Sequence, residues 1–211
     1  MSLLVASAAP LRATYVCKEI IDRVLAAALL VLVSPLLLVT ALLVATTSPG
    51  PILHRRRVVG RNGCEFDAFK FRTMVADADA ILRAHPELLR EFGANMKLRS
   101  DPRLTPVGRL LRRASLDELP QLFNVALGHM SLVGPRMIAP DEMARFGDAI
   151  ATRLAVKPGI TGLWQVSGRQ ELGYDDRVRL DLHYIENWSL WLDFAILART
   201  IPAVLSMRGA Y

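Results

Sequence analysis

The chain has 211 residues, which allows one ordinary domain with a modest appendage. Lys and Arg outnumber Asp and Glu by 26 to 20, and the net charge of +6 favours an acidic partner: anionic lipid, nucleic acid or a phosphorylated small molecule. The two cysteines, Cys17 and Cys64, exclude a disulfide framework and a metal knuckle, which indicates a reducing, cytosolic environment for the globular part.

The first predicted element is an apolar segment, residues 24–47, that carries no charge. Its 24 residues exceed the roughly 20 of a helical membrane span and the about 7 to 15 of a signal peptide's apolar region, so a cleaved signal is not expected. Ser34 and Pro35 lie close to its midpoint. Because proline removes a backbone donor and serine can bond freed backbone groups, the pair favours a helix-break-helix shape.

Basic residues flank this segment on both sides: Arg12, Lys18 and Arg23 precede it, and Arg55, Arg56, Arg57 and Arg61 follow it. Cytoplasmic flanks of membrane segments carry an excess of Lys and Arg, so both ends are expected in the cytoplasm. Each half of a broken helix would be too short to cross a bilayer. A re-entrant anchor and a kinked but complete span both remain open.

Two extended stretches are predicted to meet at Asn62-Gly63, a common hairpin turn signal. If residues 64–74 form the second strand, Lys70 and Arg72 share one face. The two cations then project together from a rigid element, although a solvated edge strand would show the same pattern. Residues 77–93 follow with helical apolar spacing that Pro86 interrupts.

The densest segment, residues 99–136, contains the adjacent acids Asp117 and Glu118. Ser115 and Glu118 imitate a capping box, but that frame places Pro120 inside the helix, where its ring is costly. The preferred frame has Asp117 at the N-cap and Pro120 in the first turn. This frame predicts carboxylates at a helix N-terminus, a position that also suits phosphate, with Arg112 just upstream.

The last predicted elements are a loop and an apolar helix. Residues 156–169 form a Gly-rich loop that includes Gln165 and ends in Arg169, and a loop without a ligand would look much the same. Residues 183–205 are apolar but contain charges, so they make a poor membrane span. Trp188 and Trp191 suit a membrane interface, although the pattern fits a core helix equally well.

The carboxylate pair gains chemical meaning from its neighbours. Most Asp-Glu pairs cap helices or face solvent. Here nearby cations could hold phosphate, and Asp can act as a phosphoryl-transfer nucleophile when arginines or a metal neutralise the substrate. Glu118 could share a divalent cation, and Mg²⁺ suits a site made of few carboxylates plus substrate phosphates.

Five ordered motifs resemble the bacterial sugar transferases, the monotopic phosphoglycosyl transferases. They are the Ser34-Pro35 pair, "KFRTM" at 70–74, "SLDELPQLFNV" at 115–125, "MSLVGPR" at 130–136 and "KPGITGLWQVSGR" at 157–169. Members of this family move a sugar 1-phosphate from a UDP-sugar to a polyprenol phosphate, usually undecaprenyl phosphate, and release UMP. They act on the cytoplasmic membrane face at the start of glycan assembly.

The resemblance implies roles for individual residues. Asp117 becomes the nucleophile that forms a covalent phosphosugar intermediate, and Glu118 becomes its partner, which binds Mg²⁺ with Asp117 or assists proton removal. Phosphate or nucleotide contacts are implied for Lys70, Arg112, Arg136 and Arg169, with Arg72 and Gln165 as further companions. The Ser34-Pro35 break is expected to return the helix to the cytoplasm.

The resulting expectation is a mostly helical α+β protein in the bacterial inner membrane. Residues 1–50 form the basic flank and re-entrant helix, and residues 51–211 form the cytosolic, membrane-interface catalytic domain with interfacial amphipathic helices. The ending "VLSMRGAY" resembles exopolysaccharide-initiating members that use glucose or galactose. No nucleic-acid module is visible, and a homodimer remains open. The alternative is a membrane-anchored basic binding protein, which would release no UMP.

Overall fold

The structure is a computed structural model that describes residues 8–95, 98, 101–168 and 172–206. It is mostly helical and α+β, as predicted, with two small two-stranded sheets. The order of the α-helices and β-strands is α1 (Ala8–Thr47), β1 (Leu53–Val59), β2 (Glu65–Phe71), α2 (Ala78–Ala84), α3 (Pro86–Asn95), α4 (Pro106–Arg113), α5 (Gln121–Ala126), β3 (Ser131–Val133), α6 (Ile150–Leu154), β4 (Gly159–Thr161), α7 (Tyr174–Glu186) and α8 (Leu190–Leu205).

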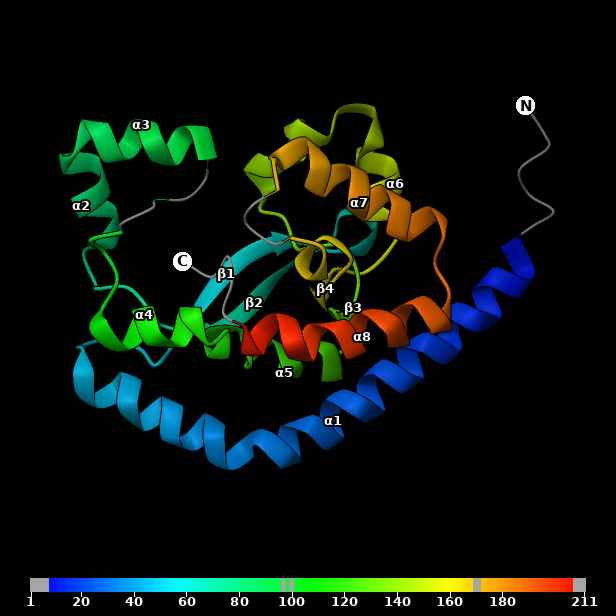
Figure 1. Cartoon of the computed structure of the whole chain (residues 1–211), viewed down its shortest axis with the longest axis horizontal. Helices are drawn as coiled ribbons and strands as arrows, with labels where there is room; N and C mark the ends of the chain where they lie inside the picture. Colours follow the sequence, from blue (N-terminus) through cyan, green and yellow to red (C-terminus); the bar gives the residue numbers. More distant parts are fainter. Residues whose placement is uncertain (1–7, 96–97, 99–100, 169–171, 207–211) are drawn as a thin grey trace.

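Helix α1 is long and bent, and the predicted interruption at Ser34-Pro35 is not confirmed, because Pro35 lies inside one continuous helix. The reason is local, because a proline at position 35 cannot donate to the carbonyl four residues earlier, Val31. The Ser34 hydroxyl donates to that carbonyl instead, at 2.8 Å. The helix therefore changes direction (Figure 1) without losing its continuity.

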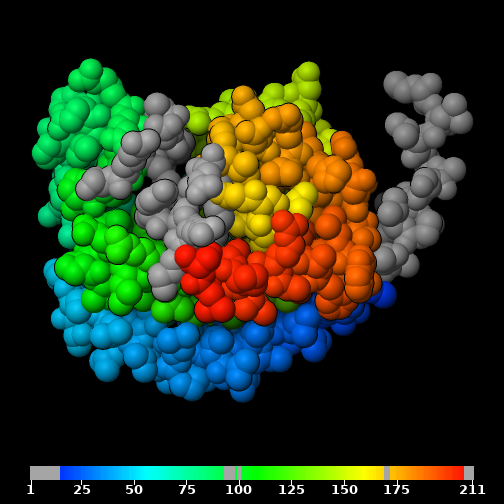
Figure 2. All heavy atoms as spheres, in the orientation of Figure 1, coloured from blue at the N-terminus to red at the C-terminus, as the bar shows by residue number. Residues whose placement is uncertain are grey.

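Both ends of α1 are attached to the rest of the protein. Near its start, Lys18 forms a buried ion pair with Asp193 of α8 at 2.6 Å. At its end, Arg72 donates to the carbonyl of Val44 in the last turn, where the helix dipole is negative, and to the carbonyls of Ser48 and Pro51 just beyond the helix. Between these points the helix runs along one edge of the molecule beside α4, α5 and α8 (Figures 1 and 2).

The segment Tyr15–Thr47 of α1 is long and apolar enough to cross a bilayer. Only 11% of its most apolar 18-residue stretch is buried, unlike the core helix of a soluble protein. The neighbouring helices also expose large apolar side chains: Leu110 on α4, Phe123 on α5, and Trp191, Phe194, Ile201 and Leu205 on α8. This arrangement is consistent with a membrane anchor.

The antiparallel β1–β2 hairpin forms at the predicted turn. Asn62 and Gly63 have φ of 59° and 78°, within the 3₁₀ turn Arg61–Gly63. Asn124 of α5 completes one edge, because its side chain accepts from the backbone N–H of Phe69 and donates to the carbonyl of Asp67. The hairpin is thereby fixed to α5, which also packs on α1.

The short helices after the hairpin follow the local signals. Pro86 separates α2 from α3, as predicted. Thr105 caps α4 by accepting from the backbone N–H of Gly108 at 2.8 Å. A Cβ at Gly108 would lie 2.0 Å from the carbonyl oxygen of Thr73, so glycine permits α4 to approach the end of β2 closely.

The second half of the chain is organised around the parallel pair β3–β4. Gly134 and Gly159 pack backbone against backbone, because a Cβ on Gly159 would lie 2.1 Å from the amide nitrogen of Gly134. A Cβ on Gly162 would likewise meet the carbonyl of Gly134 at 2.3 Å. These glycines of the "GPR" and "GITG" motifs therefore bring two loops together. The main core cluster, which includes Met137, lies between them and helices α1, α7 and α8.

A buried ionic group connects α1 to this core, and we call Lys18, Asp22 and Asp193 the anchor cluster. Lys18 lies 3.3 Å from Asp22 and 2.6 Å from Asp193. Hydroxyl and indole donors complete the two carboxylates: Ser131 binds Asp22, and Tyr184 and Trp188 bind Asp193. Trp188, whose ring lies 4.9 Å from that of Tyr15 in a tilted arrangement, is thus half-buried against the core, whereas Trp191 is 81% exposed.

Candidate active site

Asp117 and Glu118 lie in a 3₁₀ turn, Leu116–Glu118, between α4 and α5. The prediction that Asp117 is a helix N-cap is therefore wrong, since Pro120 occupies that position before α5. Proline has no N–H to donate, so the chain turns in 3₁₀ steps, with Leu119 donating to the carbonyl of Leu116, before the α-helix begins.

The turn that presents the two acids is strained at its first residue. Ser115 has φ 56° and ψ 22°, the left-handed region that costs a non-glycine residue roughly 1 to 2 kcal/mol. It follows α4 directly, so the chain reverses there and places Asp117 beside the strand end. Strain of this kind gathers where a side chain has to be held in place for function.

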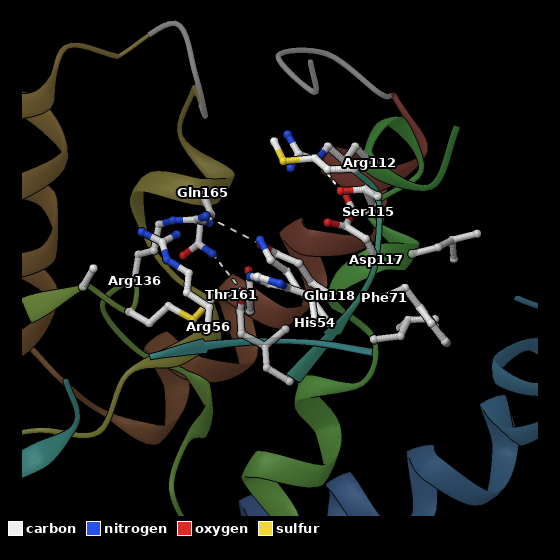
Figure 3. Close-up of a pocket in the computed structure, with 18 of the residues that line it drawn as sticks. His54, Arg56, Phe71, Arg112, Ser115, Asp117, Glu118, Arg136, Thr161 and Gln165 are labelled. Carbon is white, nitrogen blue, oxygen red and sulfur yellow. Dashed lines mark hydrogen bonds and ion pairs between the residues drawn. The ribbon is translucent and has the colours of Figure 1, made fainter. Parts of the chain in front are cut away.

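Cations surround the two carboxylates, which we call the dyad. The nearest is Arg136, whose Nη2 lies 3.6 Å from Glu118 Oε1. Figure 3 shows Arg112 on one side of the dyad and Arg136 with Gln165 on the other. The Arg112 guanidinium is fixed by donating to the Thr73 hydroxyl at 3.0 Å.

The β1–β2 hairpin contributes further positive charge on one face. Lys70 of β2 pairs in register with His54 of β1, and Arg56 lies two residues further along the same face of β1. Lys70 lowers the pKa of Asp117, and both Lys70 and Arg56 lower that of Glu118. Arg56 is itself held by Glu142 at 2.8 Å.

The pKa values of the two dyad carboxyls are shifted in opposite directions. Burial, with the adjacent Glu118 charge, raises the pKa of Asp117 to about 6, against the lowering effect of Lys70 and Arg112. Burial also acts against ionisation of Glu118, but Arg136 and the other cations lower the pKa of this carboxyl below its usual value. Burial lowers the pKa of Lys70 to about 8, despite the two acids. At neutral pH both carboxylates are therefore ionised and Lys70 is charged.

The dyad opens into a cleft of about 1310 Å³. Its walls come from the hairpin, α4, the segment after β3 and the 3₁₀ turn Trp164–Val166. Arg136 lies over the Trp164 ring at 5.8 Å, so the cleft combines an aromatic surface with fixed cations. The cations of this open cleft can bind a phosphorylated ligand, and a carboxylate of the dyad can then attack its phosphorus.

Comparison with known proteins agrees with this chemistry. The sequence profile described as "Bacterial sugar transferase" matches residues 13–207. The chain belongs to the bacterial sugar transferase family. The motif resemblance and the prediction of a transferase are confirmed.

Three curated relatives of this transferase carry names that refer to exopolysaccharide production or to sugar-phosphate transfer. The exopolysaccharide production protein ExoY of Rhizobium meliloti is 44% identical over 198 residues, 92% of this chain and 88% of that protein. The undecaprenyl-phosphate galactose phosphotransferase of Salmonella typhimurium is 46% identical over 95% of this chain, which spans only 43% of that protein. The UDP-glucose:undecaprenyl-phosphate glucose-1-phosphate transferase of Caulobacter vibrioides is 42% identical over 92% of this chain and 72% of that protein.

The structure brings most of the predicted site residues of the transferase together, but not all. Lys70, Arg112 and Arg136 surround the dyad, and Gln165 lines the same cleft. Arg72 is directed elsewhere, because its guanidinium binds the carbonyls at the end of α1. Arg169 lies outside the described residues.

Sequence reasoning missed two residues of the cleft. Arg56 was read only as part of the basic flank, and His54 was not considered. The hairpin register carried the signal, because residues 54 and 56 share the strand face that pairs with Lys70. Counting residues back from the Asn62-Gly63 turn would have found both.

The described residues contain no group of three or more His, Cys, Asp or Glu side chains that could hold a metal ion by themselves. Asp117 and Glu118 supply carboxylate oxygens only, which are ligands that Mg²⁺ accepts. Two carboxylates suit a Mg²⁺ ion that completes its shell with water and substrate phosphate, rather than a permanent structural metal. The residues present therefore fit a Mg²⁺ ion that binds together with the substrate.

Proposed function

We propose that this transferase moves glucose 1-phosphate or galactose 1-phosphate from the UDP-sugar to undecaprenyl phosphate and releases UMP, as the first membrane step of exopolysaccharide assembly. The observation that carries the proposal is the dyad in its cationic cleft: Asp117 and Glu118 with Lys70, Arg112 and Arg136 around them. The names of the Salmonella and Caulobacter relatives support the two sugars and the lipid acceptor.

The proposed chemistry has two steps. In the first, an Asp117 carboxylate oxygen attacks the phosphorus that carries the sugar, and the bond from that phosphorus to the bridging oxygen breaks. UMP leaves with the bridging oxygen and the electron pair, and an acyl phosphate remains. In the second, an oxygen of the lipid phosphate attacks the same phosphorus, and Asp117 is released as a carboxylate.

The surrounding side chains divide the work. Arg112 and Lys70 neutralise the phosphates as Asp117 approaches, which reduces repulsion between two anions. Glu118 stays ionised because Arg136 and Lys70 lower its pKa, so it can accept a proton from the acceptor phosphate. Mg²⁺ held by Asp117 and Glu118 would add charge neutralisation at the departing phosphate.

The attachment of α1 supports a monotopic arrangement. Its start is joined to α8 through Lys18 and Asp193, and its end is joined to β2 through Arg72 and Ser48. One globular part cannot lie on both sides of a bilayer, so the contacts at both ends favour a re-entrant helix over a complete span. The basic flanks favour the cytoplasmic face of the inner membrane. A cleft at that level can receive a soluble nucleotide sugar and a lipid phosphate.

The proposal is tested by UMP release from the detergent-purified chain, supplied with Mg²⁺, undecaprenyl phosphate and either UDP-glucose or UDP-galactose. We expect UMP and a lipid-linked sugar diphosphate with one of these donors. Asp148→Asn, which removes an exposed carboxylate away from the dyad, is the matched control for Asp117→Asn and should retain turnover. Absence of UMP with both donors would contradict the proposal and favour an anchored binding protein.

A further inference from the structure

Two charged residues lie buried behind Arg136, outside the dyad. Arg153 of α6 has no exposed surface, and Asp181 of α7 is 3% exposed. Arg153 Nη2 donates to the backbone carbonyl of Arg136. Burial raises the pKa of Asp181 to about 7, and the Arg153 charge and the backbone N–H of Arg136 oppose that rise. The two side chains therefore act on both polar backbone groups of one residue.

Stability alone does not account for these two charges. Arg153 Nε and Nη1, and Asp181 Oδ1, find no hydrogen-bond partner in the described part of the chain. Buried charges that do not fully satisfy each other are costly, and apolar side chains of similar volume would often be at least as stable. What the pair does provide is a hydrogen bond from Arg153 to the Arg136 carbonyl and a carboxylate that interacts with the Arg136 N–H.

Arg136 is the one cation that contacts the dyad by ion pairing within 4 Å among the described residues. Its segment follows β3 and pairs with Gly159, which fixes one side of the backbone. The side chain then reaches Glu118 and lies over Trp164. A long side chain amplifies any rotation at its Cα, so control of the backbone decides where the guanidinium arrives.

We propose that Arg153 and Asp181 are positioning residues that hold the Arg136 backbone, so that its guanidinium meets Glu118 and the donor phosphate. The inference rests on the proposed function only for the phosphate contact. Misplacement by about 1 Å can reduce turnover by about 100-fold. Because the two side chains act through Arg136, their loss matters only while the Arg136 guanidinium is present.

A double-mutant cycle tests this dependence. Arg153→Met should lower kcat/KM by about 10- to 100-fold, and adding it to Arg136→Lys should cause little further loss. Arg153→Lys, which keeps a donor and a charge, should recover part of the activity. The control is Arg103→Met, which removes another buried arginine, one paired with Asp101. The fold-loss of kcat/KM that it causes should multiply with the fold-loss caused by Arg136→Lys.

A second readout does not depend on turnover. Hydrogen exchange at the Arg136 amide should be faster in Arg153→Met and in Asp181→Leu than in the wild-type chain. Asp181→Leu removes the acceptor at similar volume, so it serves if Arg153→Met does not fold. Fully multiplicative losses in the Arg153 cycle, or unchanged exchange at Arg136 in Asp181→Leu, would overturn the inference. If the wild-type chain releases no UMP, the proposed function fails while the exchange measurement still decides the positioning role.

Discussion

The anchor cluster and the dyad each bring two carboxylates together inside the protein, with opposite outcomes. In the anchor cluster, Asp22 and Asp193 share Lys18 and receive hydrogen bonds from hydroxyl and indole donors. In the dyad, Asp117 and Glu118 face four cations, and the closest ion pair among the described residues is 3.6 Å long. The first group is closed on itself, whereas the second carries excess positive charge toward an open cleft.

This difference separates structural carboxylates from candidate catalytic ones. Closed hydrogen bonds use the acceptor sites of a carboxylate and leave none for a ligand. An open dyad keeps oxygen atoms available, and its surplus cations favour a phosphate. Adjacent Asp and Glu in a sequence do not reveal which case applies.

The largest effect is expected from breaking the dyad. Asp117→Asn keeps the side-chain shape but removes the nucleophile, so transfer to lipid should fall at least about 1000-fold. Thermal unfolding checks the fold at the same time. Because burial raises the pKa of Asp117, ionisation of this group costs stability as pH rises from about 4 to about 6. The variant should therefore unfold no more readily than the wild type at pH 7, and a large fall in Tm would indicate that Asp117 is structural.

Breaking the anchor cluster should lower the stability of the fold, unlike the loss of Asp117. Lys18→Met leaves two buried carboxylates without their cation, which should cost about 3 to 5 kcal/mol of unfolding free energy. Arg57→Met is the matched control, since Arg57 pairs with Glu65 and Asp67 at the exposed hairpin surface and should cost about 1 kcal/mol or less. Denaturant unfolding in detergent measures both. Equal costs for the two variants would remove the distinction between closed and exposed ion pairs.

A smaller effect is expected from displacing a cation beside the dyad. Gly108→Ala places a Cβ against the Thr73 carbonyl, so α4 must move and carry Arg112 with it. We expect about a 100-fold loss of turnover. Gly173→Ala is the control, because among the described residues its Cβ would meet the Asp176 carboxylate alone, at 3.5 Å. Equal turnover of the two variants would show that the close approach of α4 is not needed.

The smallest effect is the pH dependence of the first step. Transfer from the UDP-sugar to the protein should rise as Asp117 ionises near pH 6 and fall as Lys70 loses its proton near pH 8. Below pH 6 the rate should fall about tenfold per pH unit. A rate that stays flat from pH 5 to pH 9 would contradict the assigned roles of both groups.

Local sequence signals predicted much of the fold. The Asn62-Gly63 turn and the interruption at Pro86 depend on the backbone preferences of those residues, and both are confirmed. The interruption of the helix is not confirmed, and the Ser34 hydroxyl satisfies the carbonyl that Pro35 leaves without a donor. Pro120 was predicted in the first turn of the helix but lies at its N-cap, because a 3₁₀ turn precedes the helix.

Sequence spacing alone predicted the candidate site only where residues are close in sequence or share a strand face; the more distant Arg136 and Gln165 came from the family resemblance. Asp117, Glu118 and Arg112 come from one short segment, which the motifs identified. The contact of the Arg72 guanidinium with the end of α1 was not predicted, because it joins distant segments of the chain. Arg153 and Asp181 were not considered at all, since only the tertiary structure brings them to Arg136.

The central claim is that Asp117 becomes covalently linked to the sugar phosphate, and intact mass tests it most directly. The purified chain is incubated with Mg²⁺ and UDP-glucose or UDP-galactose, without a lipid acceptor. We predict a mass gain of one sugar phosphate that disappears when undecaprenyl phosphate is added and never forms in Asp117→Asn. UMP release that requires the lipid, with no mass gain under any condition, would contradict the covalent account.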